Sequence, residues 1–397
     1  MDKIMKLAGQ LENDLVDLRQ KLHSQPELSW QEIETSKMIE AELKKLGFEN
    51  VRRGFKDTGS GVIGDLVGEH PGPCVALRAD IDALPIKEEN DLPYASKNDG
   101  VMHACGHDAH TVILLGAARI LSSMKDEIHG TIRLLFQPAE EAGMDSGAPA
   151  LIAGGALDGV QAIGGLHVWA QMPVGFFGTR PGPLMASADV WELTIQGQGG
   201  HGAMPHMAVD PTVAVAQIIS MLQTIVSREI DPLESAVVSV GKVESGNAPN
   251  VIPDKAVITG NVRTTSRETK AGMEERFRRI IDGVSSALRC KAELKYTPIY
   301  PVTINDENIT SILKESAGQV VGSDKLIEVP IAMGSEDFSY YGEKVPAAFG
   351  MLGIGDPEKG TDKPHHSPHF KANDAVLSKG AALLAGFALN YQKKYRK

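Results

Sequence analysis

The stretch TIRLLFQPAEE, residues 131–141, begins as a short apolar run and ends on two adjacent carboxylates. An apolar run of this length is consistent with a buried strand, after which the polar residues follow. Similar runs occur at residues 61–67, 74–78 and 162–166, and helical patterns such as that of residues 109–124 separate them. Strands that alternate with helices predict an α/β domain with a largely parallel sheet.

The segment 186–298 has a different pattern. Its apolar periodicity predicts the element order β-α-β-β-α-β, which is the ferredoxin-like order. It contains only two of the chain's 12 histidines, His201 and His206. We therefore expect a discontinuous α/β domain, residues 1–185 and 299–397, which is interrupted by this inserted unit and carries most histidine-dependent chemistry.

Charge and cysteine content exclude several classes of protein. Lys and Arg total 40 against 51 Asp and Glu, a net charge of −11, which argues against a nucleic-acid-binding protein. Three cysteines in 397 residues exclude a disulfide-dense secreted scaffold. The longest apolar run, residues 381–389, is shorter than the roughly 20 residues of a membrane span, and charges near the N-terminus argue against a signal peptide. We expect a soluble cytoplasmic protein that binds neither nucleic acid nor membrane.

The densest group of candidate ligands is HACGHDAH, residues 103–110, which precedes a predicted helix. Cys105 and His107 are two residues apart, so in a loop both side chains could face one centre. A thiolate and an imidazole together suit Zn, Ni or related metals. The alternative is a helix N-terminus that is capped by Asp108 and carries solvent-facing histidines, but the flanking histidines favour a metal site.

Further candidate residues follow apparent strands. Adjacent carboxylates such as Glu140 and Glu141 are costly at a strand end unless positive charge lies nearby. A metal-dependent hydrolase would use one as a ligand and the other as general base, whereas an exposed acidic loop is the alternative. His167 closes another apolar run and could be a satisfied core residue. The HHSPHF turn, residues 365–370, could supply a ligand or form a polar surface turn.

The motif RADIDALP, residues 78–85, follows a third apolar run. Asp80 and Asp82 alternate along the chain, so both face the same side of an extended strand end. They could orient metal ligands or form a salt bridge with Arg78. Because ligands bind beyond the carboxyl ends of parallel strands, we expect these features to gather into a single site.

Motifs spread from residue 23 to residue 370 carry a family resemblance. They are HSQPELSWQE (23–32), RADIDALPI (78–86), MHACGHDAHT (102–111), FQPAEE (136–141), GGLHV (164–168), GGHGAMPH (199–206), NVIP (250–253) and HHSPHF (365–370). Together they resemble the M20 metallopeptidase superfamily, and more narrowly its amidohydrolase branch of N-acyl-L-amino-acid amidohydrolases, hippurate hydrolases, acetyl-diaminopimelate deacetylases and auxin-conjugate hydrolases. The resemblance implies a zinc-peptidase-like catalytic domain with an inserted ferredoxin-like lid that commonly mediates dimerisation, and hence a homodimer or higher homo-oligomer.

The resemblance also implies two divalent metal ions, whose identity could be Mn, Zn, Ni or Co. The implied ligands are Cys105, His107, Glu141, His167 and His366. Glu140 would be the general base that takes a proton from a metal-activated water and passes it to the leaving amine. Better-known members have His-x-Asp where this chain has Asp80-Ile-Asp82, and this difference leaves the role of Asp80 open. Asp82 is expected to orient a metal ligand without binding the metal itself.

Within the inserted unit, His201 matches a position that stabilises the developing oxyanion and often reaches the site of a neighbouring subunit. Asn250 and Arg263 match positions that contact the substrate or its carboxylate, which a guanidinium can bind with two parallel hydrogen bonds. The expected function is therefore metal-dependent hydrolysis of N-acyl-L-amino acids with an acetyl, benzoyl or similar acyl group.

Three alternatives stay open. A dipeptidase or carboxypeptidase would have the same fold and ligands. A hydrolase of another class would use Cys105 as a nucleophile that His107 activates. A non-catalytic metal-binding protein would keep the fold alone, although the intact pair Glu140–Glu141 argues against it.

Overall fold

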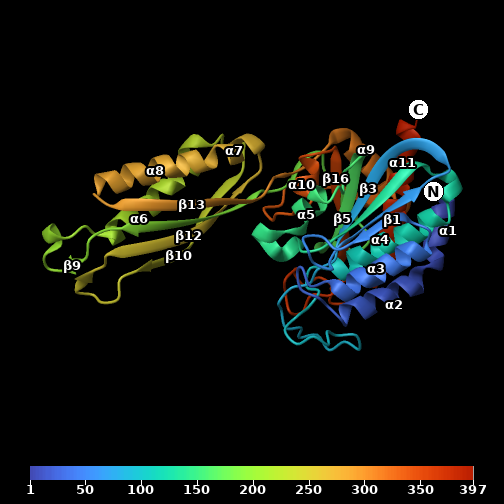
Figure 1. The fold of residues 1–397 in the computed structure, drawn as a ribbon, viewed down its shortest axis with the longest axis horizontal. Coiled ribbons are helices and arrows are strands. Elements are labelled where there is room, and N and C mark those ends of the chain that lie inside the picture. The colour runs from blue at the N-terminus through green and yellow to red at the C-terminus, as the bar shows by residue number, and fades with distance from the viewer. Residues whose placement is uncertain (397) are drawn as a thin grey trace. The chain divides into compact units, whose positions relative to one another are not determined.

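The structure is a computed structural model of the chain and describes residues 1–396. It divides into two compact units, and some elements of each are labelled in Figure 1. The first unit comprises Met1–Leu184, Ile304–Pro330 and Asp337–Lys397, and the second comprises Met185–Thr303 and Ile331–Glu336. The predicted insertion, residues 186–298, falls inside the second unit.

The first unit contains an eight-stranded sheet with the strand order β1-β2-β4-β3-β5-β16-β6-β15. In this order the strands are β1 (Glu49–Arg53), β2 (Val62–Val67), β4 (His129–Gln137), β3 (His70–Asp80), β5 (Val160–Pro173), β16 (Ala347–Gly355), β6 (Phe177–Thr179) and β15 (Leu326–Glu328). The central strands β4, β3, β5 and β16 are parallel, whereas β1–β2, β2–β4 and β16–β6 are antiparallel. The sheet is therefore mixed. The prediction of a largely parallel sheet holds for its centre and for the pair β6–β15. The pair β1–β2 is antiparallel, because the connection of residues 54–61 is too short for a crossover helix.

Helices cover this sheet. They are α1 (Asp2–Gln10), α2 (Glu12–His23), α3 (Ile33–Lys45), α4 (His107–Ser122), α5 (Gly147–Ala153), α9 (Glu307–Val321), α10 (Ser339–Gly342) and α11 (Leu377–Tyr395). Helices α4 and α11 pack against each other and on β3, while α3 packs on β1 and β2, and α9 packs on β16 and β6. Strand β16 is apolar at every position and buried over Ala347–Ile354, as expected for a central parallel strand with both faces covered.

The second unit contains the antiparallel sheet β10-β12-β8-β13. Its elements are β8 (Ala188–Gln196), β9 (Gly200–His201), α6 (Pro211–Thr224), β10 (Ala236–Ser245), β11 (Val251–Ile252), β12 (Lys255–Thr264), α7 (Arg267–Ala271), α8 (Met273–Ala287) and β13 (Lys291–Tyr300). Along β8, Trp191, Leu193 and Ile195 are buried in one cluster with residues of α6 and α8, while Glu192 is exposed. The β-α-β-β-α-β order is as predicted, and the second helical stretch of that order consists of two helices, α7 and α8, which meet at Gly272.

Strands β7 (Gly182–Met185) and β14 (Thr303–Asn305) pair with each other and contain two of the four points where the chain passes between the units; the other two lie on either side of Ile331–Glu336. In the first unit, the parallel strands β3 and β4 end together at Asp80 and Gln137. Candidate residues that follow these strands therefore start from the same edge of the sheet. Across residues 1–396, no helix combines the length and the apolarity needed to cross a membrane.

Candidate active site

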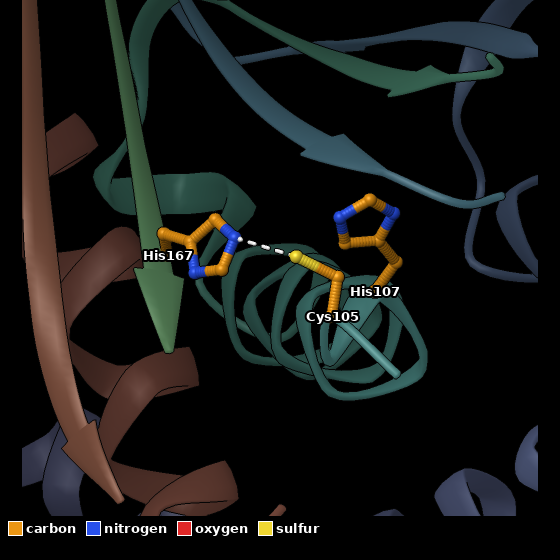
Figure 2. A group of neighbouring side chains, drawn as sticks. All are labelled: Cys105, His107 and His167. Atoms are coloured by element: carbon orange, nitrogen blue, oxygen red, sulfur yellow. Dashed lines mark hydrogen bonds between the residues drawn. The ribbon is translucent and has the colours of Figure 1, made fainter. Parts of the chain in front are cut away.

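Two of the predicted ligands lie at the start of α4. Cys105 precedes the helix, His107 is its first residue, and Gly106 between them has φ 91°. This left-handed conformation favours glycine, and an added Cβ would also lie 2.5 Å from Val168 Cγ2. Glycine therefore lets the chain turn sharply enough that both ligand side chains point into the same space (Figure 2).

His167 reaches this space from β5. Its Nε2 lies 3.4 Å from Cys105 Sγ, and its Nδ1 lies 2.5 Å from the carbonyl of Val168 (Figure 2). When Nδ1 donates its proton to that carbonyl, Nε2 presents a lone pair toward the sulfur. Burial, together with the nearby rings of His110 and His365, holds the pKa of His167 well below its ordinary value. The ring is thus neutral, as a metal ligand must be.

The two ring nitrogens of His107 also differ in their roles, as those of His167 do. Nδ1 donates to Asp82, with 3.0 Å to the backbone oxygen and 3.1 Å to Oδ1. Nε2 is buried and has no hydrogen-bond partner among the described residues. Burial alone would lower the pKa of His107, but the charges of Asp80 and Cys105 and the bond to Asp82 raise it well above its ordinary value. This field favours positive charge, which a divalent cation would supply.

Glu140 and Glu141 begin a short 3-10 turn (Glu140–Asp145) directly after β4. Glu140 is buried, and its Oε1 lies 3.4 Å from the backbone nitrogen of Asp337. The backbone N–H of Glu141 donates to Asp82 Oδ2 at 3.0 Å. Glu141 Oε1 is buried and lies 3.1 Å from His366 Nε2. The turn therefore directs both carboxylates toward the cysteine and histidine ligands.

His366 is the most exposed of the predicted ligands, with 52% of its side chain accessible. Its backbone N–H donates to the carbonyl of Ala104 at 2.8 Å, which fixes this turn to the loop that carries Cys105. Hydrogen bonding to Cys105 and Glu141 raises the pKa of His366 to about 10. In the absence of a metal its ring would therefore carry the positive charge that the surrounding anionic groups attract.

Both carboxylate oxygens of Asp80 accept hydrogen bonds from other side chains. Its Oδ2 accepts from Arg78 Nη1 at 2.7 Å, and its Oδ1 accepts from His110 Nδ1 at 2.5 Å. The other nitrogen of His110 accepts the backbone N–H of Val168 at 2.8 Å, so neither ring nitrogen is left for a metal. Of the two roles left open for the aspartates, Asp80 forms the salt bridge with Arg78, and Asp82 orients His107.

The donor atoms form overlapping groups in which all members lie within 4.8 Å of one another. Among the described residues, four of these groups contain predicted ligands, namely Cys105–His107–His167, Cys105–Glu141–His366, His107–Glu140–Glu141 and Asp80–His107–His110. The first two share Cys105, and the third joins them through His107 and Glu141. All five predicted metal ligands, together with Glu140 and Asp82, therefore lie around one centre in the first unit.

The predicted substrate residues lie in two parts of the second unit, the separate two-stranded sheet of β9 and β11 and strand β12 of the four-stranded sheet. His201 on β9 pairs with Val251 on β11, next to Asn250, and both His201 and Asn250 are exposed. Arg263 is half-buried near the far end of β12 and donates to Ser335 Oγ at 2.7 Å. Strand β12 begins at Lys255, which lies eight residues before Arg263 (263 − 255). Along a strand, eight residues separate these two positions by about 27 Å. The structure brings His201 and Asn250 together and separates both from Arg263.

A buried charge network behind α4 has no clear signal in the sequence. Asp108 Oδ2 accepts from Arg19 Nη1 at 3.1 Å and from His23 Nδ1 at 2.8 Å, and His23 Nε2 lies 3.2 Å from Glu88. Arg19 also pairs with Asp374. Burial would lower the pKa of His23, but the bonds to Asp108 and Glu88 raise it to about 9, so the ring is charged at neutral pH. Arg19 and His23 look like surface positions of an amphipathic helix, and only the placement of Asp108 directly after His107 hints at a supporting role.

Comparison with known proteins shows the family to which the chain belongs. The family model of peptidase family M20/M25/M40 matches residues 76–390. N-acetyl-L-cysteine deacetylase of Bacillus subtilis (strain 168) is 43% identical over 94% of this chain and 87% of its own length. IAA-amino acid hydrolase ILR1-like 4 of Arabidopsis thaliana is 40% identical over 95% of this chain and 85% of its own. The crystal structure of a dinuclear metal-binding peptidase of the M20 family from Bacillus subtilis is 37% identical, covers 97% of this chain and 99% of that chain, and superposes with a TM-score of 0.85.

Proposed function

The chain belongs to peptidase family M20/M25/M40 and to its amidohydrolase branch, and from this premise we propose that it hydrolyses N-acyl-L-amino acids with two divalent metal ions. One relative is named for N-acetyl-L-cysteine and another for IAA-amino acids, and both names contain an amino acid as one half of the substrate. An activity screen can identify the acyl group and the amino-acid side chain of the substrate.

The observation that carries this proposal is the pair of donor groups that share Cys105. Cys105, His107 and His167 would hold one ion, and Cys105, Glu141 and His366 would hold the other. Nε2 of His107 fits this assignment, because it has no hydrogen bond among the described residues and lies 3.8 Å from Asp80 Oδ2, and a buried nitrogen without a hydrogen bond is costly unless something else satisfies it. Mixed sulfur, nitrogen and oxygen ligands suit Zn, Mn, Ni or Co.

When bound, the two cations would lower the pKa of a water molecule and polarise the scissile carbonyl. Glu140 would accept the proton of the attacking water and deliver it to the leaving nitrogen, which becomes the free amine of the product. Its burial keeps the carboxylate out of bulk solvent, and the backbone N–H of Asp337 fixes one oxygen. Asp82 would hold His107 in the tautomer that leaves Nε2 free.

The second unit would supply the contacts to the substrate. His201 would donate to the oxyanion that develops on the carbonyl oxygen, Asn250 would contact the substrate beside it, and Arg263 would bind the carboxylate of the amino acid. His201 pairs with β11, which ends three residues before β12 begins, and Arg263 lies about 27 Å further along β12. Because this length exceeds the size of a small acyl amino acid, His201 and Arg263 would serve different sites. A homo-oligomer, in which each site takes these residues from two subunits, satisfies that geometry.

A cysteine-nucleophile mechanism fits the site poorly. A catalytic thiol needs a lowered pKa, because the thiolate is the attacking species. Burial and the neighbouring charge of Glu141 raise the pKa of Cys105 above its ordinary value. The chemistry of this sulfur is therefore better matched to metal binding than to attack on a carbonyl.

One activity screen tests the proposal against its alternatives. Protein stripped with a chelator is reloaded separately with Mn, Zn, Ni or Co and assayed with N-acetyl and N-benzoyl amino acids and with dipeptides. We expect hydrolysis of acyl amino acids only in reloaded samples. Faster cleavage of dipeptides would favour the dipeptidase alternative. A cysteine nucleophile would be favoured if thiol alkylation abolishes activity even with metal restored, whereas chelation does not. Inactivity with every metal and every substrate would favour a non-catalytic protein.

A further inference from the structure

The turn that presents Glu140 and Glu141 has a conformation that its sequence does not favour. Ala139 has φ 55° and ψ 42°, in the left-handed region where the Cβ of a non-glycine residue is crowded. Its N–H donates to Glu32 Oε1 at 2.8 Å, and its carbonyl accepts the N–H of Gly147 at 3.0 Å. Contacts from outside the turn therefore hold the strained residue in place.

Glu32 has an unusual environment for a carboxyl group. The residue is fully buried, and its Oε2 has no hydrogen-bond partner among the described residues. Burial and the charge of Asp82 raise the pKa of Glu32 to about 8, so the side chain is largely a neutral acid at pH 7. The contact that Glu32 makes with the turn is thus a hydrogen bond from the Ala139 N–H to a fully buried carboxyl oxygen.

The residues next to Glu32 contact both halves of the site. Ser29 Oγ donates to Asp82 Oδ2 at 2.7 Å, on the same carboxylate that accepts from His107. The backbone N–H that follows, at Ala83, donates to the carbonyl of Glu27 at 2.8 Å. Trp30 Nε1 donates to the carbonyl of Asp145, at the far end of the turn that begins with Glu140, at 2.7 Å. The segment 27–32 therefore spans from the support of a metal ligand to the turn that carries the base.

This segment is itself anchored on a helix. The carboxylate of Glu27 accepts the backbone N–H groups of Glu34 at 3.0 Å and Thr35 at 2.8 Å, in the first turn of α3. These two N–H groups have no partner within the helix, so Glu27 satisfies them and fixes the segment to α3. The ammonium of Lys56 lies 5.0 Å from the centre of the Trp30 ring, which adds a second attachment.

We propose that the segment 27–32 is a positioning element of the active site, in which Glu32 fixes the left-handed turn at Ala139 and thereby the direction of the Glu140 carboxylate. The catalytic part of this proposal rests on the proposed function, whereas its structural part does not. Glu32 touches neither the substrate nor the ligand atoms. Its effect is on the geometry of proton transfer, where a displacement of about 1 Å can lower the rate by roughly 10²-fold.

Two substitutions separate this role from a general effect on folding. Glu32→Gln keeps a carbonyl oxygen that can accept the Ala139 N–H and resembles the neutral acid, whereas Glu32→Leu removes the acceptor at similar volume. Glu34→Leu is the matched control, because Glu34 lies two residues further on and its side chain is 74% exposed. Each metal-loaded variant is measured for kcat, KM, metal content, melting temperature and deuterium uptake of the peptide that contains Ala139.

We expect Glu32→Leu to lower kcat by about 10- to 100-fold with KM and metal content nearly unchanged. The Ala139 amide should exchange at least about tenfold faster, because its acceptor is gone. Glu32→Gln and Glu34→Leu should stay within about threefold of the parent in both readouts. Parental exchange in Glu32→Leu, or equal damage from Gln and Leu in both readouts, would overturn the proposal. If the parent hydrolyses nothing, the proposed function fails, but the exchange readout still tests the positioning role.

Discussion

The two units of this protein hold their candidate residues in opposite ways. In the first unit, Cys105, His107 and Glu140 are buried, and neighbouring groups fix the orientation of each. In the second unit, His201 and Asn250 are exposed on a short two-stranded ribbon. A buried, pre-oriented set needs little reorganisation when charge develops, whereas exposed residues must gain their partners when the substrate binds. We therefore expect the first unit to determine whether the proposed reaction occurs, and the second to determine which molecules react and how fast.

The largest effect should come from the shared ligand. Cys105→Ala removes a donor from both metal groups, so metal affinity should fall by more than the roughly 10–100-fold that loss of a supporting residue costs. Elemental analysis after dialysis measures the remaining ions. Cys74→Ala is the control, because Cys74 lies in β3 of the same unit and belongs to none of the donor groups. Two ions retained by Cys105→Ala would remove the cysteine from the ligand set.

In the second unit, His201→Ala should lower kcat by about 10²–10³-fold, the loss typical for one oxyanion donor. Metal content should not change, because His201 belongs to none of the donor groups. The exposed His206, in the same loop, supplies the control His206→Ala. A parental kcat for His201→Ala would contradict the role of this residue.

Arg263→Lys should act on binding more than on turnover. Lysine keeps the charge but loses the planar fork that matches a carboxylate, so KM should rise about tenfold, or ~1.4 kcal/mol, with kcat nearly constant. Steady-state kinetics with one acyl amino acid measures both constants, and Arg279→Lys, at an exposed position of α8, is the control. An unchanged KM would place the carboxylate-binding group elsewhere.

The buried network behind α4 should make the stability of the first unit depend on pH. The raised pKa of His23 means that the folded state binds its proton more tightly than the unfolded state does. The resulting stabilisation is fully present below about pH 6.5 and is lost as the pH rises through about 9. Its size is at most about 3 kcal/mol.

Urea unfolding between pH 6 and pH 9.5 measures this dependence as the difference between the parent and His23→Gln. We expect the difference in unfolding free energy to shrink as the pH rises. His369→Gln, at an exposed histidine, should show no such trend. A difference that stays constant across this range would mean that the charge on His23 does not support α4.

The predicted ligands lie close together, and for most of them the reason is readable in the sequence, because they follow a strand or lie at the start of a helix; His366, which lies in a turn, is the exception. His167 ends the apolar run of β5, Glu140 follows β4, and Asp82 follows β3, so the parallel core of the sheet is sufficient to gather them. The left-handed Gly106 is also readable, because glycine between Cys105 and His107 signals a sharp turn.

Other features depend on pairings across long stretches of chain. The bond from Ala139 to Glu32 joins residues 107 positions apart, and the pair Arg19–Asp374 joins residues 355 positions apart. Neither has a local pattern, because a buried arginine on a helix looks the same in sequence as a solvent-facing one. The separation of His201 from Arg263 likewise requires the strand register of the second unit, which residue types alone do not specify.

The most direct test of the account is Glu140→Gln, measured for metal content and kcat on the same preparation. The amide keeps the volume of the side chain but cannot accept the proton. We expect both ions to be retained and kcat to fall by at least about 10²–10⁴-fold, the range that a positioned general base contributes. Retention of both ions with a near-parental kcat would contradict the assignment of Glu140 as the base and, with it, the proposed mechanism.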